Sequence, residues 1–190
     1  MKNTLFIIIL LCAFSTPSMS QGVKARTWEP KESSTKQTYK LKEETNLYVF
    51  IRDNRTNFSE YGQELKEIIV KSIKESYPET TVKWIKNLRE SQASAVNKAI
   101  IILDISDYFS VDRNIKWIGQ VTYHLTIIDM RSAGDEKFEK TIQHNVTKAG
   151  RNGLKASEDA LAKAFKGANS RLNAYIFRAL NGKEKAVLIN

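Results

Sequence analysis

Apolar and polar residues alternate in blocks from residue 46 onward, and these blocks predict strands and helices. Residues 47–51 and 99–105 are unbroken apolar runs rich in β-prone side chains, as expected of strands buried on both faces of a sheet. Residues 80–85 predict a shorter strand, and residues 88–98 predict one or two helical turns. The first half of the chain therefore predicts isolated strands joined by helical connections.

A helical period replaces the strand pattern after the first apolar run. Ser59 is the expected N-cap, and Pro78 ends the helix because proline lacks the N–H that the helix needs. Charged residues separate the apolar positions, so the predicted helix is amphipathic. Its apolar positions are Tyr61, Leu65, Ile68, Ile69, Ile73 and Tyr77.

The clearest alternation lies in residues 117–127, where apolar side chains occupy one face of a predicted strand. A turn follows over residues 131–136, and a period of two resumes in a return strand. The apolar positions of the two strands are Trp117, Val121, Tyr123, Leu125 and Ile127, then Phe138, Ile142 and Val146.

Burial of one face predicts the register of these two strands. We expect Leu125 to lie opposite Ile142 and Tyr123 to lie opposite His144, because the apolar sets then coincide. A slip by one residue would place each apolar set opposite a polar one.

A long helix is predicted to follow the second of these strands. Gly150 and Gly153 break the sheet, Ser157 is the expected N-cap, and residues 181–182 (Asn-Gly) supply the C-cap after Leu180. The helix carries a continuous apolar stripe on one face. This stripe consists of Leu161, Ala164, Phe165, Ala168, Leu172, Tyr175, Ile176 and Ala179.

The order of these elements predicts one α/β domain over residues 46–182, of two or three layers. Its mixed β-sheet would have one helix after the first strand, a C-terminal β-meander and a long closing helix. Residues 21–45 are polar without a sustained period and predict a flexible leader. Residues 183–190 form a C-terminal tail.

Residues 1–20 have the layout of a secretory signal peptide. A short basic start precedes an apolar run over residues 5–14, which is too short to span a bilayer of about 30 Å. Ser18 and Ser20 place small residues at −3 and −1 of a cut before Gln21. We expect cleavage between Ser20 and Gln21 and export, with the mature protein periplasmic, secreted or peripheral at the outer membrane.

Composition narrows the chemistry of the mature chain. Cys12, the only cysteine, lies inside the apolar run without a small residue before it, so we do not expect lipidation. Without a thiol, the mature chain cannot form disulfides, a Cys-ligated zinc site or a cysteine nucleophile. The full sequence has a net charge of +9, which falls to +8 when Lys2 leaves with the signal peptide. This charge favours anionic neighbours such as phospholipid head groups, lipopolysaccharide phosphates or acidic glycans, or a surface adapted for solubility. Export makes nucleic acid an unexpected partner.

Few residues combine into a reactive site. Asp104, Asp107 and Asp112 lie at a predicted strand end and in the loop after it, where carboxylates act as acid–base pairs or as ordinary turn residues and caps. His124 and His144 fall on opposite faces of the meander, so they cannot share a metal or a substrate. We therefore expect no catalytic, cofactor-binding or metal-binding residues.

Three arginines are candidate contacts for an anion or a protein partner. Arg52 and Arg55 lie in the polar segment after the first strand. Arg151 lies between Gly150 and Gly153 before the long helix, where free N–H groups can bind an anion. The alternative is that these glycines only form the turn from strand to helix.

The order of parts resembles a known group of envelope proteins. The features are an apolar strand leading into Asp53-Asn54-Arg55, a helix start at Tyr61-Gly62, the strand over 99–105, the segment Leu-Thr-Ile-Ile-Asp over 125–129 and an alanine-containing closing helix. Over about residues 46–180 the chain is similar to small bacterial envelope proteins, namely the YajG-like lipoproteins, the curli-secretion lipoprotein family and the amino-terminal domain of the TolB type.

That resemblance implies a non-catalytic accessory, adaptor or assembly factor. Cys12 does not fit the lipid-anchor position of this group, which argues against tethering to the membrane. The chain also lacks the pore-forming insertion of the curli-secretion type, which argues against a channel. We therefore expect a non-enzymatic exported accessory protein that binds a protein or an anionic envelope component, without a cofactor. The alternatives are an envelope hydrolase that uses Asp104, Asp107 and Asp112, or a secreted factor that acts on host molecules.

Overall fold

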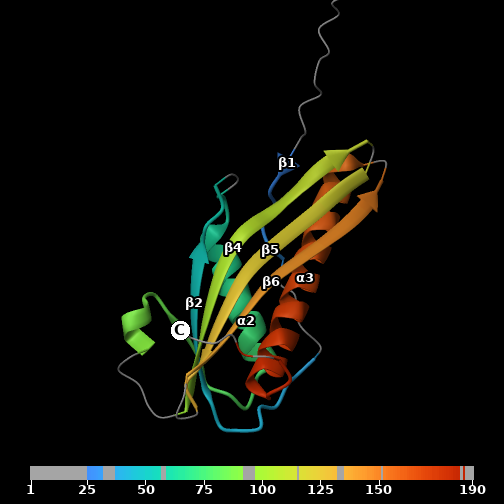
Figure 1. Cartoon of the computed structure of the whole chain (residues 1–190). Helices are drawn as coiled ribbons and strands as arrows, with labels where there is room; N and C mark the ends of the chain where they lie inside the picture. Colours follow the sequence, from blue (N-terminus) through green and yellow to red (C-terminus); the bar gives the residue numbers. More distant parts are fainter. Residues whose placement is uncertain are drawn as a thin grey trace, which may run out of the picture.

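The fold is built on a mixed β-sheet backed by helices, which confirms the predicted α/β class (Figure 1). The structure is a computed structural model. The predicted signal peptide, its cleavage site at Ser20 and Gln21, and Cys12 lie outside the described residues. The described residues are 25–31, 37–56, 59–91, 97–114, 116–131, 135–150, 152–184 and 186.

From residue 46 onward the strands and helices follow the predicted order, whereas the strand over residues 25–26 was not predicted. They are β1 (Ala25–Arg26), β2 (Asn46–Asp53), α2 (Gly62–Ser76), β3 (Val82–Ile85), the 3₁₀ turn η1 (Leu88–Ser91), β4 (Lys98–Arg113), β5 (Lys116–Asp129), β6 (Glu136–Ala149) and α3 (Gly153–Leu180).

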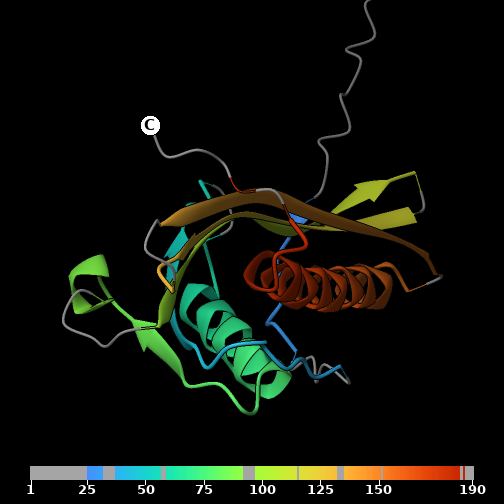
Figure 2. The same ribbon diagram turned by 60° about the horizontal axis from the view of Figure 1, so that its bottom comes forward.

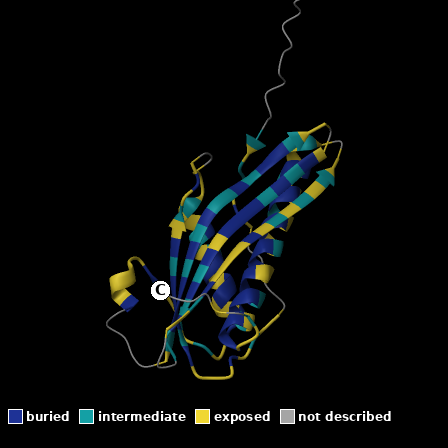
Figure 3. Ribbon diagram, in the orientation of Figure 1, coloured by how far each residue is buried: buried dark blue, intermediate teal, exposed yellow. Residues whose placement is uncertain are grey.

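The sheet has the strand order β3-β2-β4-β5-β6. Strand β2 pairs in parallel with β3 and β4, whereas β4, β5 and β6 form an antiparallel meander, and β1 pairs with the far end of β4. Helices α2 and α3 lie on the same side of the sheet, which gives two layers (Figure 2). Strand β6 is an edge strand, and exposed residues recur along its length (Figure 3).

The main core lies between the sheet and the two helices. Phe165 on the predicted stripe of α3 is fully buried and packs edge-on against Tyr108 of β4, with ring centroids 5.5 Å apart. Gly119 of β5 allows α3 to approach closely, because a Cβ there would lie 2.3 Å from the carbonyl carbon of Ala160. A smaller apolar cluster around Tyr48, Ile85 and Ile100 lies apart from this core.

Strand β4 is longer than predicted. The structure continues the strand to Arg113 across a bulge between Ile105 and Asp107, so the segment predicted as a loop belongs to the sheet. Tyr108 is buried on the core side, which explains why this polar segment stays paired with β5. The placement of Asp107 and Asp112 in a loop was therefore wrong.

The predicted register of β5 and β6 was wrong by two residues. Tyr123 lies opposite Ile142, and Leu125 lies opposite Lys140. A slip of two keeps every side chain on its own face, so the burial pattern alone cannot distinguish the two registers.

The two helices begin at other residues than predicted, so neither predicted N-cap occupies the N-cap position. Helix α3 begins at Gly153, and the side chain of Asn152 caps it by accepting from the backbone N–H of Lys155. Ser157 lies inside that helix, where it is buried. Helix α2 has Tyr61 in the left-handed conformation at its N-cap, whereas Ser59 lies before that position.

The segment predicted as a flexible leader packs between α2 and α3 where it is described (Figure 2). The indole N–H of Trp28 donates to Ser157, and the backbone carbonyl of Trp28 accepts from the hydroxyl of Tyr108. Tyr39 stacks on Tyr77 with ring centroids 5.5 Å apart. Isolated aromatic residues thus anchor this segment, and they give no periodic signal in the sequence.

No helix within the described ranges combines the length and the apolar character needed to cross a membrane.

Candidate functional site

Asp53 and Arg55 form a buried ion pair at the end of β2. The Nε of Arg55 donates to Asp53 at 2.7 Å, and its Nη2 reaches the backbone carbonyl of Glu60 at 3.1 Å, just before α2. Burial favours the neutral form of Asp53, but the hydrogen bonds and charge of Arg55 outweigh it and lower the pKa of the carboxyl. The pair joins β2 to the start of α2.

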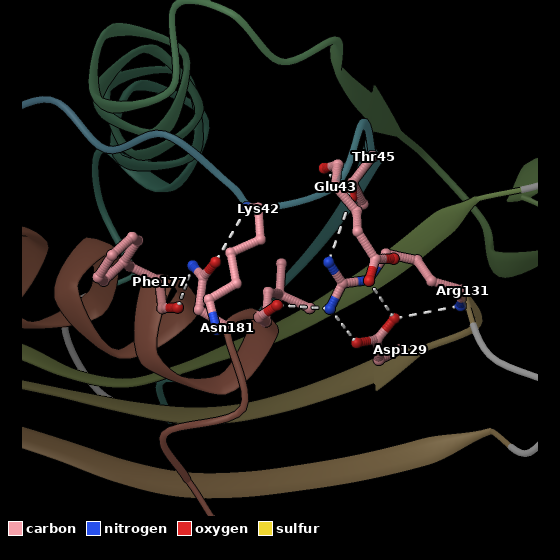
Figure 4. Close-up of polar contacts among 8 residues, drawn as sticks. Lys42, Glu43, Thr45, Asp129, Arg131, Phe177 and Asn181 are labelled. Carbon is pink, nitrogen blue, oxygen red and sulfur yellow. Dashed lines mark hydrogen bonds and ion pairs between the residues drawn. The ribbon is translucent and has the colours of Figure 1, made fainter.

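The same spacing recurs at the end of β5, where Asp129 pairs with Arg131 (Figure 4). The Nε of Arg131 donates to Asp129 at 2.7 Å, and its Nη2 donates to the carbonyl of Leu180 at 2.5 Å. The hydrogen bond to Asp129 raises the pKa of Arg131. Because a helix carboxyl end attracts positive charge, Arg131 stabilises the end of α3.

Residues from the amino-terminal segment complete this second contact. Thr45 accepts from Arg131 at 3.4 Å, and the backbone N–H of Lys42 donates to the side chain of Asn181 at 3.0 Å (Figure 4). We call these two ion pairs, Asp53–Arg55 and Asp129–Arg131, the Asp-x-Arg clamps. Their arginine side chains are only 1% and 9% exposed, so they serve the fold.

A cleft opens where α3 passes beneath the edge strand β6, and it is the strongest candidate for a binding site. It has a volume of about 440 Å³ and contains three basic side chains beside one tyrosine. The described residues that line it include no carboxylate. We call it the α3–β6 cleft. It is lined by Lys140, Thr141, Ile142, Gln143, Arg171, Ala174, Tyr175 and Arg178.

Two side chains of α3 bond the exposed edge of β6. Arg171 donates through Nη1 to the carbonyl of Gln143 at 3.0 Å, and the hydroxyl of Tyr175 donates to the carbonyl of Glu139 at 3.2 Å. These bonds occupy two edge carbonyls that another strand would otherwise need. They also fix the position of α3, one wall of the cleft, relative to β6, the other wall.

The charges of the cleft are incompletely neutralised. Lys140 and Arg178 lie 6.0 and 5.7 Å from the centre of the Tyr175 ring, as in cation–π contacts. Arg178 pairs with Glu184 at 2.6 Å. Among the described residues, neither Lys140 nor Arg171 forms an ion pair with a carboxylate. The cleft therefore keeps a net positive charge.

Of the predicted contact arginines, the two that the structure describes have separate partners. Arg52 forms a two-pronged ion pair with Asp104, whereas Arg55 is buried in the first Asp-x-Arg clamp. Arg151 lies outside the described residues. The sequence therefore did not identify the cleft residues. The only sequence signal for the cleft is the pair of basic residues Arg171 and Arg178, which lie seven positions apart on one side of the long helix.

Asp104 and Asp107 lie on one face of the sheet, opposite residues two positions apart on β5, but Asp112 lies away from them. Asp104 lies opposite His124, whose ring bonds Thr141, and Asp107 accepts from Gln120 at 3.1 Å. Asp112 lies opposite Trp117 near the other end of the strand. Within the described residues, no group of three or more potential ligands could hold a metal ion.

The two histidines differ as predicted in their surroundings. His124 is exposed, whereas His144 is half-buried against Gly167 of α3. Burial, reinforced by the charge of Arg171, lowers the pKa of His144. His144 lies opposite Val121 and not opposite Tyr123, as the shifted register requires.

Comparisons with known proteins define the class of fold. No protein-family model matches the sequence, and no curated protein matches it. The hypothetical protein CT253 from Chlamydia trachomatis matches in structure with a TM-score of 0.51 at 8% identity, covering 73% of this chain and 99% of that one. At this identity the likeness shows the fold alone.

Similar solved structures with lower scores include two bacterial lipoproteins. Lipoprotein GNA1162 from Neisseria meningitidis has a TM-score of 0.38 at 9% identity, covering 73% of this chain and 99% of that one. A minor lipoprotein from Acinetobacter baumannii has a TM-score of 0.39 at 8% identity, with 74% and 97% covered. The specific families named from the sequence remain a prediction.

Proposed function

We propose that this protein is a non-enzymatic exported accessory protein that binds an anionic component of the cell envelope in the α3–β6 cleft. The observation that carries this proposal is the cleft itself, in which Lys140, Arg171 and Arg178 gather without a carboxylate in the described lining. The signal-peptide pattern of residues 1–20 supports export.

The chemistry of the lining favours an anionic ligand. Guanidinium groups bind phosphate and carboxylate with paired hydrogen bonds, and an ammonium group adds a point charge. The volume of about 440 Å³ suits a ligand of head-group or sugar size. Tyr175, whose pKa is raised by burial, stays neutral and adds an uncharged wall.

Calorimetric titration of the mature chain with inorganic pyrophosphate tests this proposal. We expect binding at low salt and a loss of about tenfold in affinity, or about 1.4 kcal/mol, for Arg171→Gln. The matched control is Lys86→Gln, which removes one exposed charge after β3, at the opposite edge of the sheet from β6.

Two outcomes would overturn the proposal. One is an equal affinity of Arg171→Gln and Lys86→Gln, since binding would then reflect net charge only. The other is hydrolysis of the pyrophosphate that is lost in Asp104→Asn, since the protein would then be an enzyme.

A further inference from the structure

Basic residues continue beyond the α3–β6 cleft along the junction of strand and helix. On β6, Lys140, His144 and Lys148 recur every four residues, and a strand places such positions on the same face. Because the chain reverses between β6 and α3, Lys148 lies beside the first half of the helix, where Lys163 is its neighbour. Arg171 and Arg178 continue the helix side of the same junction toward Lys140.

The middle of this junction is closely packed. A Cβ at position 167 would lie 2.1 Å from Nε2 of His144, so Gly167 leaves the space that this imidazole occupies. His144 therefore lies between the cleft and the lysine pair. It remains half-exposed, so a ligand that crosses the junction would pass over its ring.

Lys148 and Lys163 form an unfavourable pair in the unliganded protein. Their ammonium groups lie close enough to interact, and the proximity of Lys163 lowers the pKa of Lys148. Asp159 is the acidic neighbour that opposes this effect. An anion placed between the two ammonium groups would remove their repulsion.

We propose that Lys148 and Lys163 extend the α3–β6 cleft into one track that binds a linear anionic glycan. This inference rests on the proposed function and names its ligand class. The track follows β6 over eight residue-to-residue steps from Lys140 to Lys148, which is about 26 Å at about 3.3 Å per step. A ligand with repeated phosphate, sulfate or carboxylate groups would meet cations at both ends and in the cleft.

The geometry favours a glycan over a peptide strand or a bilayer. An added peptide strand needs the edge carbonyls of β6, and those of Glu139 and Gln143 already accept from α3. A bilayer needs cations that project from one surface, whereas these cations line the junction of a strand and a helix.

Sulfated oligosaccharides of two lengths test the track. The probes are a heparin disaccharide, which can fill only the cleft, and a heparin oligosaccharide longer than the track. We expect the double variant Lys148→Gln/Lys163→Gln to bind the long probe about tenfold more weakly while its affinity for the disaccharide is unchanged. The slope of log affinity against log salt for the long probe should become shallower by about one for each ammonium group removed.

Two further variants separate this inference from the proposed function. Arg171→Gln should weaken both probes, and Lys86→Gln should weaken neither. If the lysine double variant binds the long probe as tightly as the wild type does, the proposed track is contradicted, but the proposed binding in the cleft is not. If Arg171→Gln changes neither probe, the cleft itself is wrong. Tighter binding to anionic phospholipid vesicles than to the long probe would also overturn the glycan assignment. Thermal unfolding verifies that each variant is folded.

Discussion

The Asp-x-Arg clamps and the α3–β6 cleft use the same side-chain chemistry for opposite purposes. In the clamps, each guanidinium is buried, pairs with a carboxylate two residues earlier and donates to a backbone carbonyl beside a helix end. In the cleft, Arg171 bonds one edge carbonyl and no described carboxylate, and it remains exposed. An arginine is available to a ligand only where its N–H groups are not already occupied by carboxylates and carbonyls. The residue type alone therefore does not identify a binding arginine.

The two clamps also differ from each other in their relation to the helices. The Asp53 carboxylate lies beside Gly62 at the start of α2, where a Cβ would be 2.6 Å from its Oδ2. Arg131 instead contacts the end of α3. Each clamp therefore presents to its helix the charge that the helix dipole favours. Both clamps join the end of a strand to the end of a helix by hydrogen bonds, and so fix how the sheet and the helices pack.

Substitution in the buried face of α3 should have the largest effect on stability. Phe165→Ala removes a fully buried ring, and we expect the free energy of unfolding to fall by about 4 kcal/mol. Urea unfolding measures this loss. Lys163→Ala, at an exposed position of the same helix, should change stability by less than about 0.5 kcal/mol. Equal effects of the two substitutions would show that this stripe does not hold α3 to the sheet.

Breaking a clamp should have the next largest effect. Arg131→Ala leaves Asp129 buried without its partner and leaves the carbonyl of Leu180 unpaired, so we expect a loss of about 3 kcal/mol. Thermal and urea unfolding measure it. The matched control is Arg171→Ala, which should cost less than about 1 kcal/mol because its charge is solvated. A similar loss in both variants would remove the distinction between clamp and cleft.

Salt should separate the two regions without any mutation. Raising the ionic strength from about 0.05 to 0.2 M should weaken pyrophosphate binding on the order of tenfold, because the cleft cations are exposed to counterions. The stability difference between the wild type and Arg131→Ala should change much less, because buried pairs are poorly screened. Calorimetry and urea unfolding at both salt concentrations test this. Salt-independent binding would argue against an electrostatic cleft.

The predictable parts of this protein are those with periodic burial. The apolar runs of β2 and β4 and the alternation of β5 identified the strands, and the stripe around Phe165 identified the buried face of α3. Trp28 could not be placed, because a single aromatic residue carries no period and its contacts with Ser157 and Tyr108 are long-range.

The candidate site was less predictable than the fold. Its lining joins β6 to α3, and the sequence pattern predicted which face of each element is buried but not which residues of β6 lie beside Arg171. The clamps could have been recognised from the shared Asp-x-Arg spacing at two strand ends, at Asp53 and Asp129. The sequence predicts Arg55 as a contact residue because it does not show that this guanidinium is buried.

Substitution of His144 should give the smallest change in stability. It tests how the surroundings of His144, between the core and the cationic junction, affect the protonation of its ring. Its ring packs against Gly167, while Arg171 faces it from α3 and Lys140 and Lys148 lie four residues away on its own strand. Burial lowers the pKa of His144 below its ordinary value near 6.5, so between these two values the unfolded chain binds more protons than the folded one. Stability should therefore be complete above about pH 6.5 and should fall slightly as the pH drops toward the pKa of the folded state.

His144→Gln should remove this part of the pH dependence in melting curves, whereas His124→Gln on the exposed face should leave it intact. If instead the wild type gains stability between pH 7 and 5 and His144→Gln abolishes that gain, protonation of His144 is favoured in the folded state. The junction would then be less cationic than the track requires.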